Sequence, residues 1–210
     1  SGIAGEAMLR ADSVQEQRDL IGAGRKNLII NGAFQVSQRG DFTSASSSSD
    51  ETYYIDRFKH NQSGVNVNKQ HVTTNQPTEI SNTKSLKLTA TSSGTGFFGA
   101  RQSVEDYKIF NGRVFTISAY IKTNHPSFRF YLYNGTSVVT SDAAIADGNW
   151  HRLESTFYFD ASIGDRLAIE ILAITSGGSA ASVTSGDHVE FTGVQLELGS
   201  VATDFEHRSY

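Results

Sequence analysis

The sequence contains no cysteine and only 2 prolines among its 210 residues. Without cysteine the chain can form no disulfide framework, no thiol nucleophile and no cysteine zinc site, so packing alone has to hold the fold. No stretch approaches the roughly 20 apolar residues that span a bilayer, and the first residues lack the basic and then apolar pattern of a signal peptide. Because the chain opens on Ser1-Gly2 and not on Met, we expect a processed chain or a fragment of a longer polypeptide.

Positive charge is also scarce. The chain has 18 Lys and Arg against 22 Asp and Glu, which gives a formal net charge of -4, and its basic residues do not cluster along the sequence. Proteins that bind nucleic acid neutralise phosphates with clustered Lys and Arg. We therefore expect no nucleic-acid partner.

Motifs for catalysis or metal binding are missing as well. The 6 histidines form no H-E-x-x-H or H-x-H pattern, and there is no G-x-S-x-G elbow, P-loop or dinucleotide fingerprint. Glycoside hydrolysis needs two carboxylates about 5 to 10 Å apart in a cleft. The available carboxylates all have an ordinary interpretation as surface strand or turn residues: Asp56, Glu105, Asp106, Glu154, Glu170 and Glu190. The sequence thus predicts a protein that is not an enzyme.

Aromatic residues and glycines are well supplied, with 13 Phe, 8 Tyr and 19 Gly, which favours strands and tight turns over helix. Residues 127–133 and 153–159 alternate between apolar and polar side chains, as in strands with one buried face. The buried faces are predicted to carry Phe128, Phe130, Leu132, Leu153, Phe157 and Phe159. The outer faces are predicted to carry Arg129, Tyr131, Tyr133, Glu154, Thr156 and Tyr158.

Two runs are more continuously apolar, at 114–121 and 166–174, as expected of central strands covered on both sides. Further strands are predicted at 28–30, 55–58, 65–72, 85–88, 97–104 and 188–198. Polar stretches rich in Ser or Gly at 43–50, 91–96 and 175–182 indicate surface loops. These strands suffice for two sheets, so the sequence predicts an all-β fold, a β-sandwich of the jelly-roll type.

The first 25 residues have a different pattern. The letters DSVQE at 12–16 offer a capping box, and we expect a short helix that ends at Gly22. The chain therefore divides into a connector with a short N-terminal helix, 1–25, and a β-sandwich, 26–210. A helix below about 12 residues is marginal alone. It is expected either to fray or to dock, on the sandwich or on copies of itself, and burial of Leu20 and Ile21 between copies favours a homotrimer.

Several outward-facing aromatic side chains are candidates for ligand binding. An aromatic ring can pack on the C–H face of a sugar while nearby polar groups bind its hydroxyls. The candidates are Tyr131, Tyr133, Tyr158, Trp150 and Arg129. The ordinary alternatives are that these tyrosines reflect β-propensity alone and that Trp150 anchors the core.

Motifs at both ends of the chain resemble a known family. Residues 27–40 read NLIINGAFQVSQRG, residues 53–58 read YYIDRF, and residues 193–208 read GVQLELGSVATDFEHR. These segments resemble bacteriophage and prophage tail-fibre proteins. The letters FTISAYIK at 115–122 and DGNWHR at 147–152 look like a strand and a turn of carbohydrate-binding-module-like jelly rolls.

The resemblance implies a distal tail-fibre domain of the virion that binds a host surface receptor, often a glycan, and assembles as a homotrimer with other fibre segments. Two alternatives stay open: a structural tail or capsid module without ligand, and an accessory domain of a glycan-degrading enzyme. The end motifs also have a structural interpretation, in which the first and last segments pair and Asp56-Arg57 fixes the turn by a charge-assisted bond.

Related binding modules hold a structural calcium near the opening Asn-Gly segment and an acidic pair before the last strand. Here that place reads Phe191-Thr192-Gly193, which supplies no carboxylate. Asn31, Asp187 and Glu190 are the only oxygen ligands worth checking. We therefore expect no cofactor and no metal site.

Overall fold

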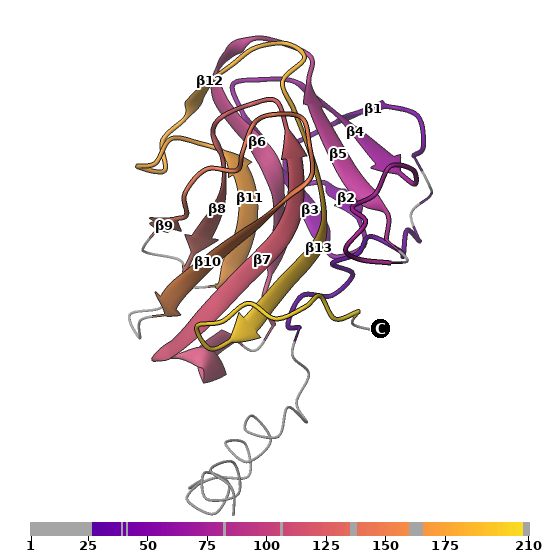
Figure 1. Ribbon diagram of the computed structural model, residues 1–210. Coiled ribbons are helices and arrows are strands. Elements are labelled where there is room, and N and C mark those ends of the chain that lie inside the picture. The colour runs from indigo at the N-terminus through magenta and orange to yellow at the C-terminus, as the bar shows by residue number, and fades with distance from the viewer. Residues whose placement is uncertain are drawn as a thin grey trace, which may run out of the picture.

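The computed structural model describes residues 27–38, 40, 42–81, 83–105, 107–134, 138–159 and 166–207. Apart from the 3-10 turn η1 (Tyr107–Phe110), these residues build strands and their connections, stacked in two antiparallel layers (Figure 1). The predicted connector and its helix lie outside the described residues. Within those residues no helix is long and apolar enough to span a membrane.

Each layer is one sheet. Sheet A has the order β1 (Ser46–Ser48), β4 (Val67–Val72), β5 (Ser85–Ala90), β13 (His188–Leu198), β7 (Arg113–Thr123) and β10 (His151–Phe159). Sheet B has the order β2 (Tyr53–Ile55), β3 (Phe58–Ser63), β6 (Gly94–Ser103), β11 (Ala168–Ala173), β8 (Phe128–Tyr133) and β9 (Val138–Thr140), with β12 (Ala181–Val183) added on β6. The fold is the predicted β-sandwich.

Strand periodicity predicted the central elements correctly. β7 lies between β13 and β10, and β11 lies between β6 and β8. Every residue of β11 is buried, as the continuous apolar run indicated. In β8 the buried and half-buried residues alternate, so Phe128, Phe130 and Leu132 face the core while the other three side chains face outward. This alternation places the predicted ligand-binding residues of β8 on the surface of sheet B.

Other predicted elements were wrong in part. Residues 28–30 form no strand, and the expected strand at 55–58 is broken into β2 and β3 by a turn in which Arg57 has φ 74°. Gly94 and Gly96 belong to β6, although the Ser- and Gly-rich stretch 91–96 was predicted to be a loop. A Cβ on Gly96 would lie 2.2 Å from the carbonyl oxygen of Ser63, so the glycines serve close strand approach here.

The opening motif, residues 27–40, holds the two ends of the domain together. The buried Asn27 side chain accepts hydrogen bonds from the backbone N–H groups of Ile29 (2.9 Å) and Leu196 (3.2 Å). Its amide donates to the carbonyl oxygens of Val194 (3.3 Å) and Glu206 (3.2 Å). One side chain therefore ties the start of the domain to β13 and to the C-terminal segment, which confirms that the two ends pair.

The phenylalanine of the same motif joins the two sheets. Phe34 has φ 53°, and its ring lies 4.8 Å from that of Phe58 in sheet B and 5.4 Å from that of Phe191 in sheet A. Asp56 binds the backbone N–H of Gln38 at 2.6 Å, a charge-assisted bond. Arg57 does not share this bond and pairs with Glu105 instead.

The closing motif folds the chain back over sheet A. From the outer face of β13, Gln195 donates to the carbonyl oxygen of Asp204 (3.2 Å) and accepts from the N–H of Glu206 (2.7 Å). Glu197 accepts from the N–H of Thr203 at 3.0 Å. Both side chains are buried beneath this segment. Part of the outer face of sheet A is therefore covered by the protein itself.

Candidate functional site

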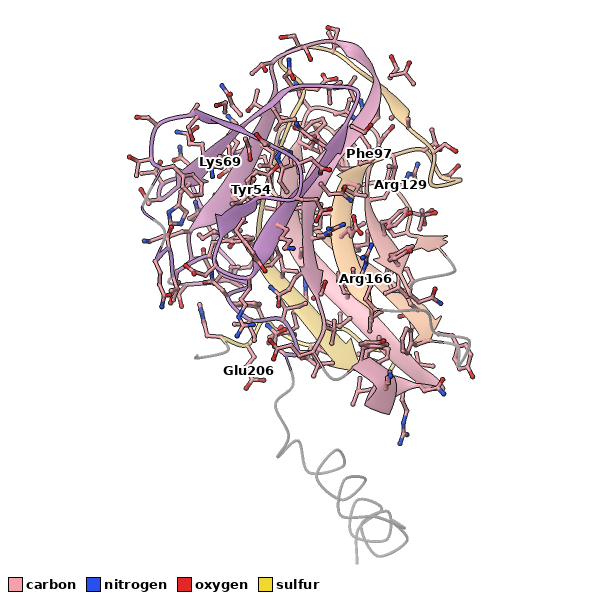
Figure 2. The ribbon with its side chains drawn as sticks, turned by 180° about the vertical axis from the view of Figure 1, so that it is seen from behind. Tyr54, Lys69, Phe97, Arg129, Arg166 and Glu206 are labelled. Carbon is pink, nitrogen blue, oxygen red and sulfur yellow. The ribbon has the colours of Figure 1, made fainter. Side chains whose placement is uncertain are left out.

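The outer face of sheet B carries a polar and aromatic surface, on the layer opposite to the one that the described C-terminal segment covers. Register alignment across β3, β6, β11 and β8 places Lys59, Arg101, Glu170 and Tyr131 in one row. The neighbouring rows hold Asn61 and Arg129 on one side and Tyr133 on the other. We call this surface the sheet B face; Phe97, Arg129 and Arg166 are seen over its strands in Figure 2.

Glu170 lies at the centre of this face and is nevertheless only 3% exposed. Asn61 donates a hydrogen bond of 2.5 Å to its carboxylate. Burial raises the pKa of Glu170, while the bond from Asn61 and the charge of Arg101 act in the opposite direction. The flanking side chains thus make the middle of the face poorly hydrated, which strengthens polar contacts made there.

Arginines surround the two tyrosines of β8. The guanidinium carbon of Arg166 lies 4.8 Å from the centre of the Tyr133 ring, a cation–π arrangement. Arg129 donates to the carbonyl oxygens of Ile174 (3.3 Å) and Ser141 (3.0 Å), which hold its guanidinium in place. Burial raises the pKa of Tyr131, and the charge of Glu170 adds to the rise. Both tyrosines are half-buried and keep part of their rings at the surface.

At the edge of the face, Arg101 contacts both carboxylate oxygens of Glu51. Lys59 lies 3.9 Å from the same carboxylate. Glu51 therefore neutralises part of the positive charge on the β3 side, whereas the β8 side is bordered by Arg129 and Arg166.

The structure brings together three of the five predicted ligand-binding residues: Arg129, Tyr131 and Tyr133. Tyr158 lies on β10 of sheet A, the opposite layer, and Trp150 directly precedes that strand. The Trp150 ring is half-buried, its N–H donates to the carbonyl oxygen of Asn75 at 2.7 Å, and the Lys122 ammonium lies 5.1 Å from its centre. The tryptophan is thus neither a core anchor nor part of the sheet B face.

Five residues of the face were not identified from sequence as ligand-binding: Lys59, Asn61, Arg101, Arg166 and Glu170. The signal for Glu170 was present, because a lone carboxylate interrupts the apolar run at 166–174. The other four lie in segments whose neighbours in the sheet cannot be predicted from periodicity.

The three oxygen ligands considered for calcium are used within the fold. Asn31 donates to the carbonyl oxygens of Val36 and Asp56, Asp187 accepts from the N–H of Thr184, and Glu190 binds Ser85 and Lys122. In the described ranges no group of three or more His, Asp or Glu side chains could hold a metal ion.

A scan against protein-family models and a search of curated proteins give no match. Solved structures match over most of the chain. The enzymatically active domain of bacteriophage CBA120 tailspike protein 4 is 15% identical with a TM-score of 0.52, covering 82% of this chain and 21% of that one. The chain thus spans about a fifth of that enzymatically active domain.

Two smaller proteins match over nearly their whole length. A cyclase from Fischerella sp. TAU is 12% identical with a TM-score of 0.55, covering 84% of this chain and 98% of that one. The CBM22-2 xylan-binding domain of Paenibacillus barcinonensis Xyn10C is 16% identical with a TM-score of 0.50, covering 73% and 99%. At these identities the matches establish a carbohydrate-binding-module-like jelly-roll fold, which enzymes and binding modules share.

Proposed function

We propose that the protein binds a glycan on the sheet B face without catalysis, as the receptor-binding domain of a phage tail fibre. The observation that carries the proposal is the row of half-buried tyrosines on β8 beside the buried Glu170 and its arginine neighbours. Aromatic rings with fixed polar groups around them suit the C–H face and the hydroxyls of a sugar. The xylan-binding domain and the tailspike domain with the same fold support this assignment.

Binding without hydrolysis fits the chemistry of the face. Among the described residues of the face, Glu170 is the only carboxylate besides Glu51, and Glu51 is engaged by Arg101 and Lys59. A glycosidase would need one carboxylic acid and one available carboxylate on either side of the scissile bond. A host surface polysaccharide is the receptor that the tail-fibre motifs favour, and we propose that the domain lies at the distal end of the virion fibre.

Replacing Tyr131 by alanine should weaken glycan binding. Loss of one ring from a stacking contact costs roughly 1 kcal/mol, about a fivefold increase in Kd. The measurement is calorimetric titration with short oligosaccharides from host surface polysaccharides that score on an array, so that affinity is read per protomer. Tyr158→Ala removes the same ring from sheet A and should leave Kd within about twofold.

Three outcomes would contradict the proposal. No array signal with any host polysaccharide would favour a structural module without ligand. Equal losses for the two tyrosine variants would move the site away from the sheet B face. Steady release of reducing ends from a polysaccharide would make the protein an enzyme.

The predicted homotrimer has a candidate contact surface at one corner of the sandwich. Three of the large apolar side chains that are exposed lie where β7 begins, where β10 ends and just after β13: Val114, Tyr158 and Val201. Val114 and Tyr158 are cross-strand partners, and the N–H of Gly199 binds the Val114 carbonyl at 2.8 Å. We infer that copies of the chain meet here, since burial of such side chains drives association. Three linked tips would also raise avidity for a repeating polymer.

Light scattering on the 210-residue chain should therefore give the mass of three copies. The double variant Val114→Ser/Tyr158→Ser should shift the mass toward one copy, whereas Ile145→Ser, a side chain that is 56% exposed in the connection between β9 and β10, should not. A chain that starts at Lys26 tests whether the connector contributes. A monomeric intact chain would refute the trimer, and an unchanged double variant would refute this contact.

A further inference from the structure

We propose that the sheet B face selects acidic glycans and binds a sugar carboxylate through Arg129. This inference rests on the proposed function and narrows its ligand class. The charge of the face differs in sign from that of the whole chain. The chain as a whole carries a net charge of -4, yet the face gathers the cations Lys59, Arg101, Arg129 and Arg166 around a single internal carboxylate, Glu170.

The acidic groups offset this charge unevenly. Glu51 contacts Arg101 and Lys59, both on the β3 and β6 side of the face. Glu170 takes its hydrogen bond from Asn61, also on β3. The charge of Glu170 also acts on Arg166, so the positive charge that remains beside the tyrosines of β8 is that of Arg129. A ligand that stacks on Tyr131 or Tyr133 would meet this charge with its substituents.

The guanidinium of Arg129 is held in a position that is ready to bind a carboxylate. Its two hydrogen bonds go from Nε and Nη1 to backbone carbonyl oxygens, which are neutral, and none of the ion pairs among the described residues includes Arg129. A guanidinium has five N–H donors in a planar fork, and these bonds use two of them. The fork is fixed before the ligand arrives, so less side-chain entropy is lost on binding. Such a group suits a bidentate carboxylate more than a single hydroxyl.

The experiment uses an array of acidic bacterial surface polysaccharides that contain uronic acids, each printed in its native form and after chemical reduction of the carboxyl groups to alcohols. Neutral surface polysaccharides are printed beside them. The intact protein is expected to bind native acidic members and to lose at least tenfold in signal on the reduced form of the same polymer.

Variants then assign the effect to Arg129. Arg129→Gln should weaken binding of the acidic polysaccharide at least tenfold, and Arg129→Lys, which keeps the charge but not the fork, should lie between. Lys87→Gln removes one positive charge from the outer face of β5 in sheet A and should change binding less than twofold. If Arg129→Gln does not fold, Arg166→Gln provides the charge removal on the same side of the face.

The outcomes distinguish selection of acidic glycans from glycan binding as such. Equal binding to native and reduced polymers, or binding to neutral members only, overturns the inference and leaves glycan binding on this face intact. Binding that is lost equally with Arg129→Gln and Lys87→Gln also overturns it, because the effect would then be one of overall charge. Absence of binding to every member overturns both the inference and the proposed function.

Discussion

Replacing Gly32 by alanine is expected to lower the free energy of unfolding by more than about 4 kcal/mol, the range reserved for severe structural conflicts. A Cβ on Gly32 would lie 2.0 Å from the carbonyl oxygen of Val194, a backbone atom that cannot rotate away. The carbonyl of Gly32 also accepts the N–H of Val194 at 3.0 Å. Relief of the overlap would separate the two segments and break the hydrogen bonds that Asn27 makes beside them.

Gly177→Ala is the matched control, since it adds the same methyl group. No atom lies within 4 Å of the position that a Cβ would take at Gly177, so its effect on stability should stay within about 0.5 kcal/mol. Urea and thermal unfolding compare the two variants with the parent chain. For a domain of this size 4 kcal/mol corresponds to a Tm lower by roughly 10 °C. Equal midpoints for the Gly32 and Gly177 variants would show that the strand contact tolerates a side chain.

The opening motif illustrates how far sequence reasoning reaches. The letters at 27–40 suggested a structural role and a pairing with the closing segment, and both are present. The letters alone could not show why each position needs its particular residue type. Asn27 is required because an amide can both accept from and donate to the backbone of three segments, and Gly32 because a carbonyl oxygen occupies the place of its Cβ.

Only part of the candidate site could be predicted from the sequence, because periodicity describes single strands and not their pairing. Alternation within residues 127–133 determines which side chains of one strand share a face, and these were placed correctly. It says nothing of which sheet a strand joins. Tyr158 therefore had the same pattern as Tyr131 but lies on sheet A, and Arg101 joined the face only through the pairing of β6 with β11.

The sequence did not predict two short strands, because their extended conformation comes from pairing with a neighbour and not from their composition. β1 lies within the serine-rich stretch 43–50, and β12 ends the stretch 175–182. β1 has no apolar period, and the alternation in β12 covers only Ala181–Val183, too few residues to identify a strand. Each pairs with a single neighbour, β4 or β6, and takes its extended conformation from it.

Acid is expected to destabilise the protein through His60, an inward-facing residue of β3 that is 0% exposed. Its Nδ1 lies 2.9 Å from the Ser48 hydroxyl, and the Tyr54 ring is 4.4 Å away. Among the described residues Nε2 has no hydrogen-bond partner, so a second ring proton would be buried without an acceptor. Burial accordingly lowers the pKa of His60 from 6.5 to about 4, with Asp50 opposing and Lys69 adding a smaller effect.

A lowered histidine pKa means that the unfolded chain binds the proton more readily than the folded one. Stability from His60 is therefore complete above about pH 6.5 and is lost as the pH falls toward 4. At roughly 1.4 kcal/mol for each pKa unit, the loss is on the order of 2–3 kcal/mol. Urea unfolding between pH 7 and 4 measures it, and His60→Gln, which cannot titrate, should flatten this part of the profile. A ring nitrogen NMR titration of the parent chain reads the same group directly, and a midpoint for His60 near 6.5 would contradict the assignment.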